Sequence, residues 1–157
     1  MSPAPIFRPA AAEDEEFLFA LYCSTRAPEL EALPGGAEER ATLLRLQFRA
    51  QRLHYQAQFP NAQHLIVLDE GQPAGRLLTD RTDEEIRIID IALMPGARNR
   101  GIGSQIICEV LAEAALSGRP VRLRVWKHNP AARLYRRLGF QVTGDDGVHL
   151  QMEWRAG

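Results

Sequence analysis

The sequence predicts a mixed α/β domain in which helices cover a central sheet. Short runs with apolar residues at every second position alternate with longer segments whose apolar residues recur every three or four positions. Strands and helices mixed along one chain are typical of an α/β sandwich. With 157 residues and neither an internal repeat nor a linker, the chain is expected to form a single domain over 1–157.

The N-terminal half predicts a strand, two helices and a hairpin. Acidic residues at 13–16 occupy the first turn of a predicted helix, 12–26, where the helix dipole favours them. The break at 28–36 contains Pro34-Gly35-Gly36. It leads into a helical region, 37–59, that could form in two pieces and that Pro60 ends. Strands are predicted at 6–8, 65–68 and 74–79, the last two joined by a turn at 69–72.

The C-terminal half predicts four strands and two helices. The long apolar run 84–94 has the length and continuity of a central strand. A Gly-rich turn then opens a helix that runs to about Ser117, with Gly118 as its C-terminal stop. Asn129-Pro130 opens a second helix that runs to Leu138. The remaining predicted strands are 121–126, 140–143 and 149–154.

Composition excludes several classes of partner. Hydrophobic residues make up 45% and charged residues 25%, and the net charge is −1, so neither nucleic acid nor a membrane is expected as a partner. No apolar run approaches the roughly 18 residues of a membrane span, and residues 1–9 lack a signal-peptide pattern. A cytoplasmic protein is expected. Cys23 and Cys108 are predicted to be buried, and no metal is expected because no cluster has ligand spacing.

The segment Arg98-Asn99-Arg100-Gly101-Ile102-Gly103-Ser104 has the chemistry of an anion site. It joins a strand to a helix, whose first turn carries unpaired N–H groups and partial positive charge, and glycines allow a phosphate to approach the backbone. A tight turn without a ligand is the simpler alternative. A Rossmann site would need a third glycine where Ile106 stands, and a P-loop would need a Gly-Lys-Ser/Thr sequence that is absent.

Two motifs resemble the GNAT acetyltransferases. Arg98-x-x-Gly101-x-Gly103 is similar to the family's Q/R-x-x-G-x-G/A motif, and 129–140 resembles its N-x-x-A-x-x-L-Y-x-x-x-G-F segment. The resemblance covers about 84–143 in detail and implies the GNAT fold, a mixed sheet with splayed fourth and fifth strands. It implies acetyl transfer from acetyl-CoA, a co-substrate, to a primary amine by direct attack in a ternary complex.

By this resemblance, the backbone of Ile91–Leu93 and the flanking Asn129 would hold the pantetheine, and the turn would hold the pyrophosphate. The implied cofactor-binding residues are Ile91, Ala92, Leu93, Arg98, Asn99, Arg100, Gly101, Ile102, Gly103, Ser104, Asn129, Ala132 and Tyr135. Tyr135 matches the family's usual general acid, which protonates the leaving thiolate. A core aromatic on an amphipathic helix is the alternative for Tyr135.

Asp90 is the candidate base, because a carboxylate inside an apolar strand must be paired or face a cleft. The alternatives for Asp90 are a structural salt bridge and a strand-end position that faces water. Arg133, Arg136 and Arg137 could meet the 3′-phosphate of CoA or form a solvated face. Gln51, His54 and Tyr55 could border the acceptor site or form an exposed polar face.

The expected acceptor is a small-molecule amine. A protein or peptide amine, or a non-catalytic acyl-CoA-binding module, are the alternatives. Members of the family often form dimers, so a homodimer is one assembly that the resemblance implies.

Overall fold

A computed structural model describes residues 5–26, 32 and 34–157. Its helices and strands follow the predicted order. They are β1 (Ile6–Pro9), the 3₁₀ turn η1 (Ala12–Asp14), α1 (Glu15–Thr25), α3 (Ala37–Gln58), β2 (Gln63–Asp69), β3 (Gln72–Arg81), β4 (Ile86–Leu93), the 3₁₀ turn η2 (Pro95–Ala97), α4 (Ile102–Ser117), β5 (Val121–Trp126), α5 (Ala131–Arg137), β6 (Gln141–Asp145) and β7 (His149–Trp154).

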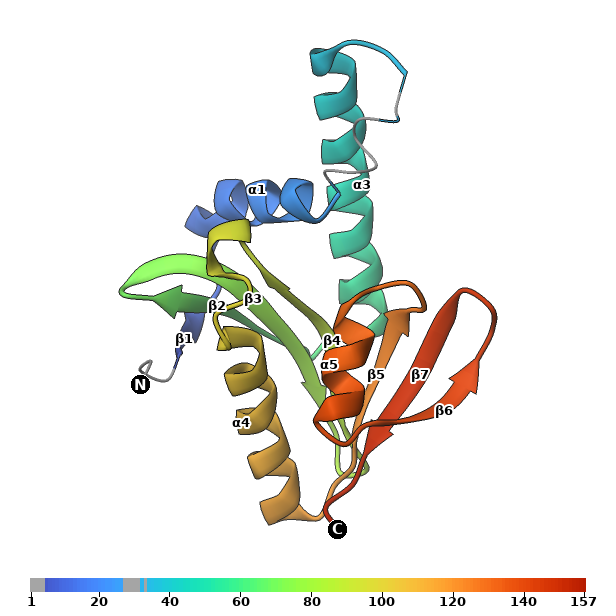
Figure 1. The fold of residues 1–157 in the computed structure, drawn as a ribbon. Helices are drawn as coiled ribbons and strands as arrows, with labels where there is room; N and C mark the ends of the chain where they lie inside the picture. Colours follow the sequence, from blue (N-terminus) through green and yellow to red (C-terminus); the bar gives the residue numbers. More distant parts are fainter. Residues whose placement is uncertain (1–4, 27–31, 33) are drawn as a thin grey trace.

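The strands form one mixed sheet in the order β1-β2-β3-β4-β5-β7-β6. The predicted central strand, β4, is the fourth of these seven, and it runs parallel to β5 while the other neighbouring pairs are antiparallel. Figure 1 shows α4 and α5 together against the sheet, with α1 and α3 near the opposite end of the molecule. This α/β architecture confirms the predicted fold class.

Two apolar clusters hold the helices in place. The larger joins the sheet to α4 and α5, and its fully buried members include Ile86, Ile106 and Met152. The smaller joins α1 to α3 through Tyr22, Leu44 and Phe48. Between α3 and the sheet lie the polar side chains of Gln51, Arg76 and Asp90, which belong to neither apolar cluster.

The splay between β4 and β5 has a local cause. The two strands pair only from Ile86 to Ile88, opposite 121–123. On the other side of β4, Thr79 is opposite Ile88 and Leu78 is opposite Asp90, so Ile89 is the extra residue of a β-bulge. Because a bulge bends its strand and increases the local twist, β4 diverges from β5 just beyond their last paired residues. This confirms the predicted splayed strands.

The predicted helical region at 37–59 is confirmed as a single helix over 37–58, because Leu44 and Phe48 anchor its middle against α1. The prediction that both cysteines are buried was wrong. Cys108 is exposed, because it lies on the outer side of α4, and Cys23 is half-buried beside the smaller cluster. Much of the predicted break at 28–36 lies outside the described residues. Within the described chain, no helix is long and apolar enough to cross a bilayer.

Candidate functional site

The Gly-rich turn brings successive backbone N–H groups to the start of α4. Asn99 and Gly101 both have left-handed backbone conformations, with φ of 60° and 80°. Gly101 immediately precedes α4, and its carbonyl accepts the first helical hydrogen bond, from Gln105 N at 3.1 Å. Alternating left- and right-handed residues turn neighbouring N–H groups toward one concave surface, an arrangement that binds anions.

These N–H groups have no acceptor within the described chain. Among residues 5–26, 32 and 34–157, none of the amides from Asn99 to Ser104 donates a hydrogen bond, whereas the flanking amides of Arg98 and Gln105 do. The amides at Ile102, Gly103 and Ser104 also form the first turn of a 16-residue helix, where the partial positive charge is concentrated. An array of unpaired amides at a helix start is suited to a phosphate or pyrophosphate.

The arginines of the turn are anchored by nearby acceptors. Arg98 Nε donates to the carbonyl of Leu93 at 3.0 Å, which ties the turn to the end of β4. Arg100 Nη1 donates to Asp69 Oδ2 at 2.8 Å, which ties the turn to the end of β2. The two arginines therefore hold the turn between the ends of β4 and β2. The side chain of Arg100 remains half exposed.

The turn lies next to an unpaired strand edge. From Ile89 to Leu93 the edge of β4 that faces β5 has no strand partner in the described chain. On the far side of this gap, Asn129 Oδ1 accepts a hydrogen bond from Ala131 N at 2.9 Å and so caps α5. Ala132 is buried on the inner side of the first turn of α5. The free edge of β4 and the start of α5 therefore flank the same gap, as the resemblance implies for a pantetheine site.

Tyr135 lies on α5 and belongs to the apolar cluster that joins the sheet to α4 and α5, which fits the core-aromatic alternative. It is buried, its ring packs 5.6 Å from that of Phe140, and its hydroxyl makes no hydrogen bond within the described chain. Burial, together with the negative charge of Asp90, raises the pKa of the Tyr135 phenol well above its ordinary value. The phenol therefore stays protonated at neutral pH, as a general acid must be.

Asp90 approaches the gap from the opposite face of the sheet, where it pairs with Arg76 of β3. Arg76 Nε donates to Asp90 Oδ2 at 2.8 Å, and Nη2 of the same guanidinium donates to that oxygen as well. Nη2 also donates to Gln51 Oε1 on α3 at 3.2 Å. The structure thus shows the salt bridge that was one alternative for Asp90, and it leaves Asp90 Oδ1 without a hydrogen bond in the described chain.

Helix α3 contributes side chains to the polar group around Arg76 and Asp90, so it is more than an exposed polar face. Gln51 and Tyr55 are partly buried, whereas His54 is exposed. Burial raises the pKa of the Tyr55 phenol, and the charge of Asp90 adds to the effect. Gln51 and Tyr55 therefore lie beside the Arg76–Asp90 pair, whereas His54 belongs to the solvated face of α3.

Arg76 is the residue that sequence reasoning missed. Its side chain is only 12% exposed, and it lies in an inner strand of the sheet, next to Leu77 and Leu78. The signal was available, because a charge inside an inner strand needs a partner, and Asp90 interrupts the next strand in the same way. What the sequence lacks is the register that brings the two side chains together.

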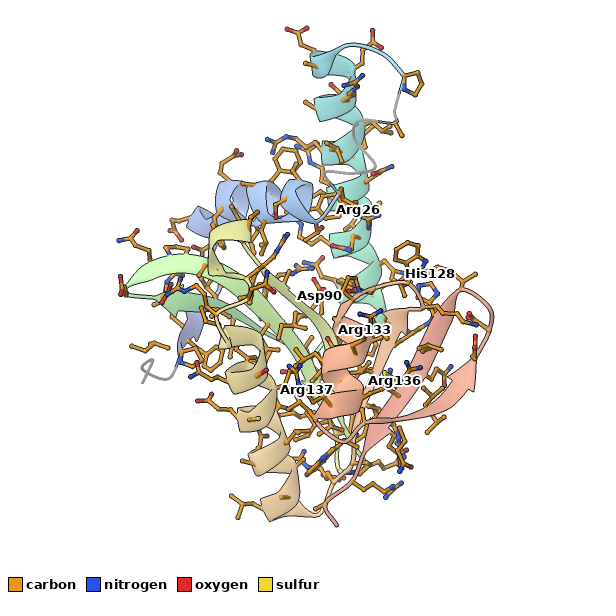
Figure 2. All side chains as sticks on the ribbon, in the orientation of Figure 1. Arg26, Asp90, His128, Arg133, Arg136 and Arg137 are labelled. Atoms are coloured by element: carbon orange, nitrogen blue, oxygen red, sulfur yellow. The ribbon has the colours of Figure 1, made fainter. Side chains whose placement is uncertain are left out.

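The arginines of α5 form an unneutralised basic face. Arg133, Arg136 and Arg137 are exposed, and none forms an ion pair with a described residue. Figure 2 shows them along α5, with Asp90 nearby at the gap and His128 in the loop before the helix.

The fold and this gap define a class of enzyme. A family model for the acetyltransferase (GNAT) domain matches residues 60–142, which include the bulged strand, the Gly-rich turn and α5. The chain therefore belongs to the GNAT acetyltransferase family.

The sequence of the chain is similar to that of a curated relative. It is 30% identical to mycothiol acetyltransferase of Saccharopolyspora erythraea over 116 residues, which are 65% of this chain and 36% of that relative. The match thus spans about a third of the length of that relative.

Two solved structures share the fold at low sequence identity. The PaiA N-acetyltransferase of Thermoplasma acidophilum, in complex with coenzyme A, aligns with a TM-score of 0.72 and 18% identity, over 98% of this chain and 100% of that one. PH1933 of Pyrococcus horikoshii aligns with a TM-score of 0.73 and 16% identity, over 98% of this chain and 99% of that one.

Proposed function

We propose that the protein transfers the acetyl group of acetyl-CoA to a primary amine of a small molecule. The observation that carries this proposal is the unpaired amide array from Asn99 to Ser104, placed next to the free edge of β4. The amide array suits a pyrophosphate, and the free strand edge suits a chain that contains amide groups. CoA carries a pyrophosphate followed by the two amides of its pantetheine. The coenzyme A bound to the related PaiA enzyme supports the same assignment.

The turn would hold the pyrophosphate through its amides, and Arg98 and Arg100 would add positive charge at its rim. The free backbone groups of Ile91, Ala92 and Leu93 would pair with the pantetheine, as a further strand would. Asn129 and Ala132 would close the other side. The basic face of α5, formed by Arg133, Arg136 and Arg137, is exposed and free to attract the 3′-phosphate.

Tyr135 would act as the general acid. The amine nitrogen attacks the thioester carbonyl carbon, and the resulting tetrahedral species collapses with cleavage of the carbon–sulfur bond. The leaving thiolate then takes the phenolic proton of Tyr135. A buried phenol with a raised pKa supports this role in one respect, because the phenol is fully protonated at neutral pH and its proton is in place when the carbon–sulfur bond breaks.

Asp90 would receive the amine on the other side of the gap. Arg76 occupies Asp90 Oδ2, so Oδ1 is the oxygen that can accept a hydrogen bond from the substrate. A negatively charged oxygen beside the amine favours the orientation with its lone pair toward the thioester and can accept its proton. Gln51 and Tyr55 would border this acceptor side.

The binding step is tested by calorimetric titration of acetyl-CoA, with CoA and ATP as comparators. We expect acetyl-CoA to bind the wild-type protein and Gly103→Glu to lose it, because the new carboxylate would occupy the phosphate position. Gly96→Glu is the matched control, since it adds the same charge at a position with no heavy atom near its Cβ site. No binding by the folded wild-type protein would refute the proposal.

The transfer step is tested by release of free CoA thiol over a panel of amines that includes amino acids, polyamines and short peptides. Turnover with small amines is the expected result. Turnover confined to peptides would reassign the acceptor to a protein. Binding of acetyl-CoA without turnover of any amine would refute the assignment of Tyr135 and Asp90 as catalytic residues.

A further inference from the structure

Trp126, the last residue of β5, projects from the face of the sheet that carries Asp90. Val121, Leu123 and Val125 of β5 are buried in the larger apolar cluster, so the alternating residues, which include Trp126, point to the opposite face. Asp90 lies on this opposite face, because the ion pair that it forms is hydrogen-bonded to α3. The indole is therefore on the side of the gap at which the amine would arrive, and it is 52% exposed.

The backbone and a neighbouring ring hold Trp126 in place. His128, in the loop between β5 and α5 (Figure 2), packs edge-on against the indole, with ring centroids 5.4 Å apart and an interplanar angle of 80°. The carbonyl of Trp126 accepts a hydrogen bond from Asn129 N at 2.9 Å, and Lys127 N donates to the carbonyl of Val148 at 2.9 Å. Trp126 is thus fixed beside Asn129, which caps α5 at the gap.

The fold of one chain makes little use of this indole. Among the described residues, Trp126 belongs to neither apolar cluster, whereas Trp154 packs against the larger one. A half-exposed ring that is already held in place can stack on a flat ring of a ligand and loses little conformational entropy when it does so.

The charges near Trp126 disfavour a polycationic acceptor. The groups that α3 contributes beside Asp90, Gln51 and Tyr55, are uncharged. Four carboxylates around this face of the sheet already form ion pairs with arginines, namely Asp90 with Arg76, Glu85 and Glu153 with Arg122, and Asp146 with Arg124. A polyamine would need several carboxylates without such partners. The surroundings instead suit an acceptor whose amine is its only charged group.

We propose that Trp126 determines acceptor specificity, and that the acceptor is a primary amine joined by a short chain to an aromatic ring. The ring would stack on the indole while the amine lies at Asp90 Oδ1. This inference rests on the proposed function, because it uses the same gap and the same position for the amine. A flat ring can contact the face of an indole over most of its area, which a thin aliphatic chain cannot.

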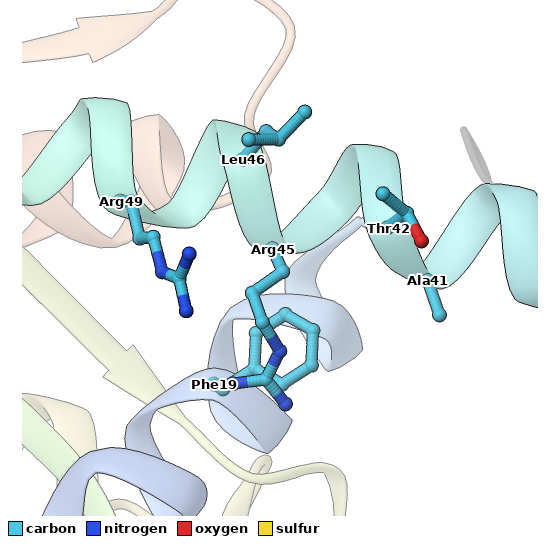
Figure 3. A pocket seen from close by; sticks show the side chains of 6 residues that line it. All are labelled: Phe19, Ala41, Thr42, Arg45, Leu46 and Arg49. Atoms are coloured by element: carbon cyan, nitrogen blue, oxygen red, sulfur yellow. The ribbon is translucent and has the colours of Figure 1, made fainter.

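The open groove between α1 and α3 does not fit such an acceptor. In Figure 3 the guanidinium of Arg45 covers the ring of Phe19, 4.0 Å from its centroid, so this aromatic ring is already occupied. The groove is lined by Phe19, Ala41, Thr42, Arg45, Leu46 and Arg49. All of these residues belong to α1 or α3, so the groove contains no residue of β4 or β5.

Steady-state kinetics with phenylethylamine, butylamine and diaminobutane test the proposal. We expect kcat/KM for phenylethylamine to exceed that for butylamine about 10-fold, and diaminobutane to be no better than butylamine. Trp126→Ala should abolish the preference for the aromatic amine, chiefly through a higher KM, and Trp126→Phe should retain most of it. Leu116→Ala is the matched control, because it removes an apolar side chain of α4 that is 93% exposed. It should keep the preference.

A preference for diaminobutane in the wild-type protein would overturn the proposal. So would a ratio of phenylethylamine to butylamine that Trp126→Ala leaves unchanged. If that variant weakens acetyl-CoA binding in calorimetry and leaves the ratio unaltered, the indole contacts the cofactor and not the acceptor.

Tryptophan fluorescence gives a readout that does not depend on turnover. The chain has two tryptophans, so only Trp154 emits in Trp126→Phe. We expect phenylethylamine, added to protein saturated with CoA, to change the emission of the wild type and not that of Trp126→Phe. Such a signal without turnover of any amine would refute the proposed function and keep the aromatic site. Turnover of amines without such a signal would refute the aromatic site alone.

Discussion

The Gly-rich turn can be tested with one methyl group. Gly101 has φ of 80° and ψ of 1°, a conformation that costs a residue with a Cβ about 1–2 kcal/mol. A Cβ built at Gly101 meets no heavy atom within 4 Å, so Gly101→Ala introduces strain without a clash. The folded chain can keep the conformation and lose stability. Alternatively, the turn can relax, and acetyl-CoA must then restore the conformation when it binds.

These two effects draw on the same strain, so their sum is fixed although their division is not. We expect the loss of unfolding free energy, from chemical denaturation, and the loss of acetyl-CoA binding free energy, from calorimetry, to total about 1–2 kcal/mol. If all of it appears in the unliganded protein, Tm falls by about 2–8 °C. If all of it appears in binding, Kd rises about 5- to 30-fold.

Gly96→Ala is the control for this experiment. Gly96 lies outside the left-handed region, and its Cβ site is equally open. Stability and acetyl-CoA affinity should both stay within about 0.5 kcal/mol of the wild-type values. A total near zero for Gly101→Ala would refute the reasoning, because it would show that neither the fold nor the ligand needs the left-handed turn.

Four further substitutions test other parts of the site. Tyr135→Phe should lower kcat about 100-fold or more while acetyl-CoA affinity stays unchanged, and an unaltered kcat in steady-state assays would exclude the phenol as the acid. Asp90→Asn should reduce the unfolding free energy by about 1–3 kcal/mol, because the mostly buried guanidinium of Arg76 loses its charged partner. It should also lower kcat. Equal denaturation midpoints for the variant and the wild type would contradict the predicted loss of stability. Gly75→Ala should destabilise the sheet without changing the chemistry, because its Cβ would lie 2.3 Å from a carbonyl oxygen of β4, and a wild-type Tm would contradict it. Burial and the charge of Arg76 lower the pKa of His64 from 6.5 to about 4. As pH falls from 6.5 to about 4, the unfolded state therefore binds more protons than the folded state, and the stability of the wild type should fall. Denaturation at each pH should show a smaller fall for His64→Gln.

The sequence alone was sufficient for the features that local chemistry controls. The order of strands and helices follows from apolar periodicity, and helix ends follow from residues such as Gly118, whose left-handed conformation ends α4. The Gly-rich turn was also identifiable, because the unpaired amides of a helix start and the left-handed conformation of Gly101 are properties of a few consecutive residues. The resemblance of that turn and of 129–140 to one family added the expected cofactor.

Only the tertiary structure decided how the two sides of the gap meet. Asp90 and Arg76 are 14 positions apart, and their pairing depends on the register of β3 against β4. The bulge at Ile89 breaks that register and sets where β4 leaves β5, so no local pattern could locate the free strand edge. The same holds for α3, whose leucines lie on different faces of the helix, with Leu44 on one and Leu46 and Leu53 on another. Packing against α1 selects Leu44 for the interior and leaves Leu46 exposed, because burial depends on which neighbours surround a helix and not on its own periodicity.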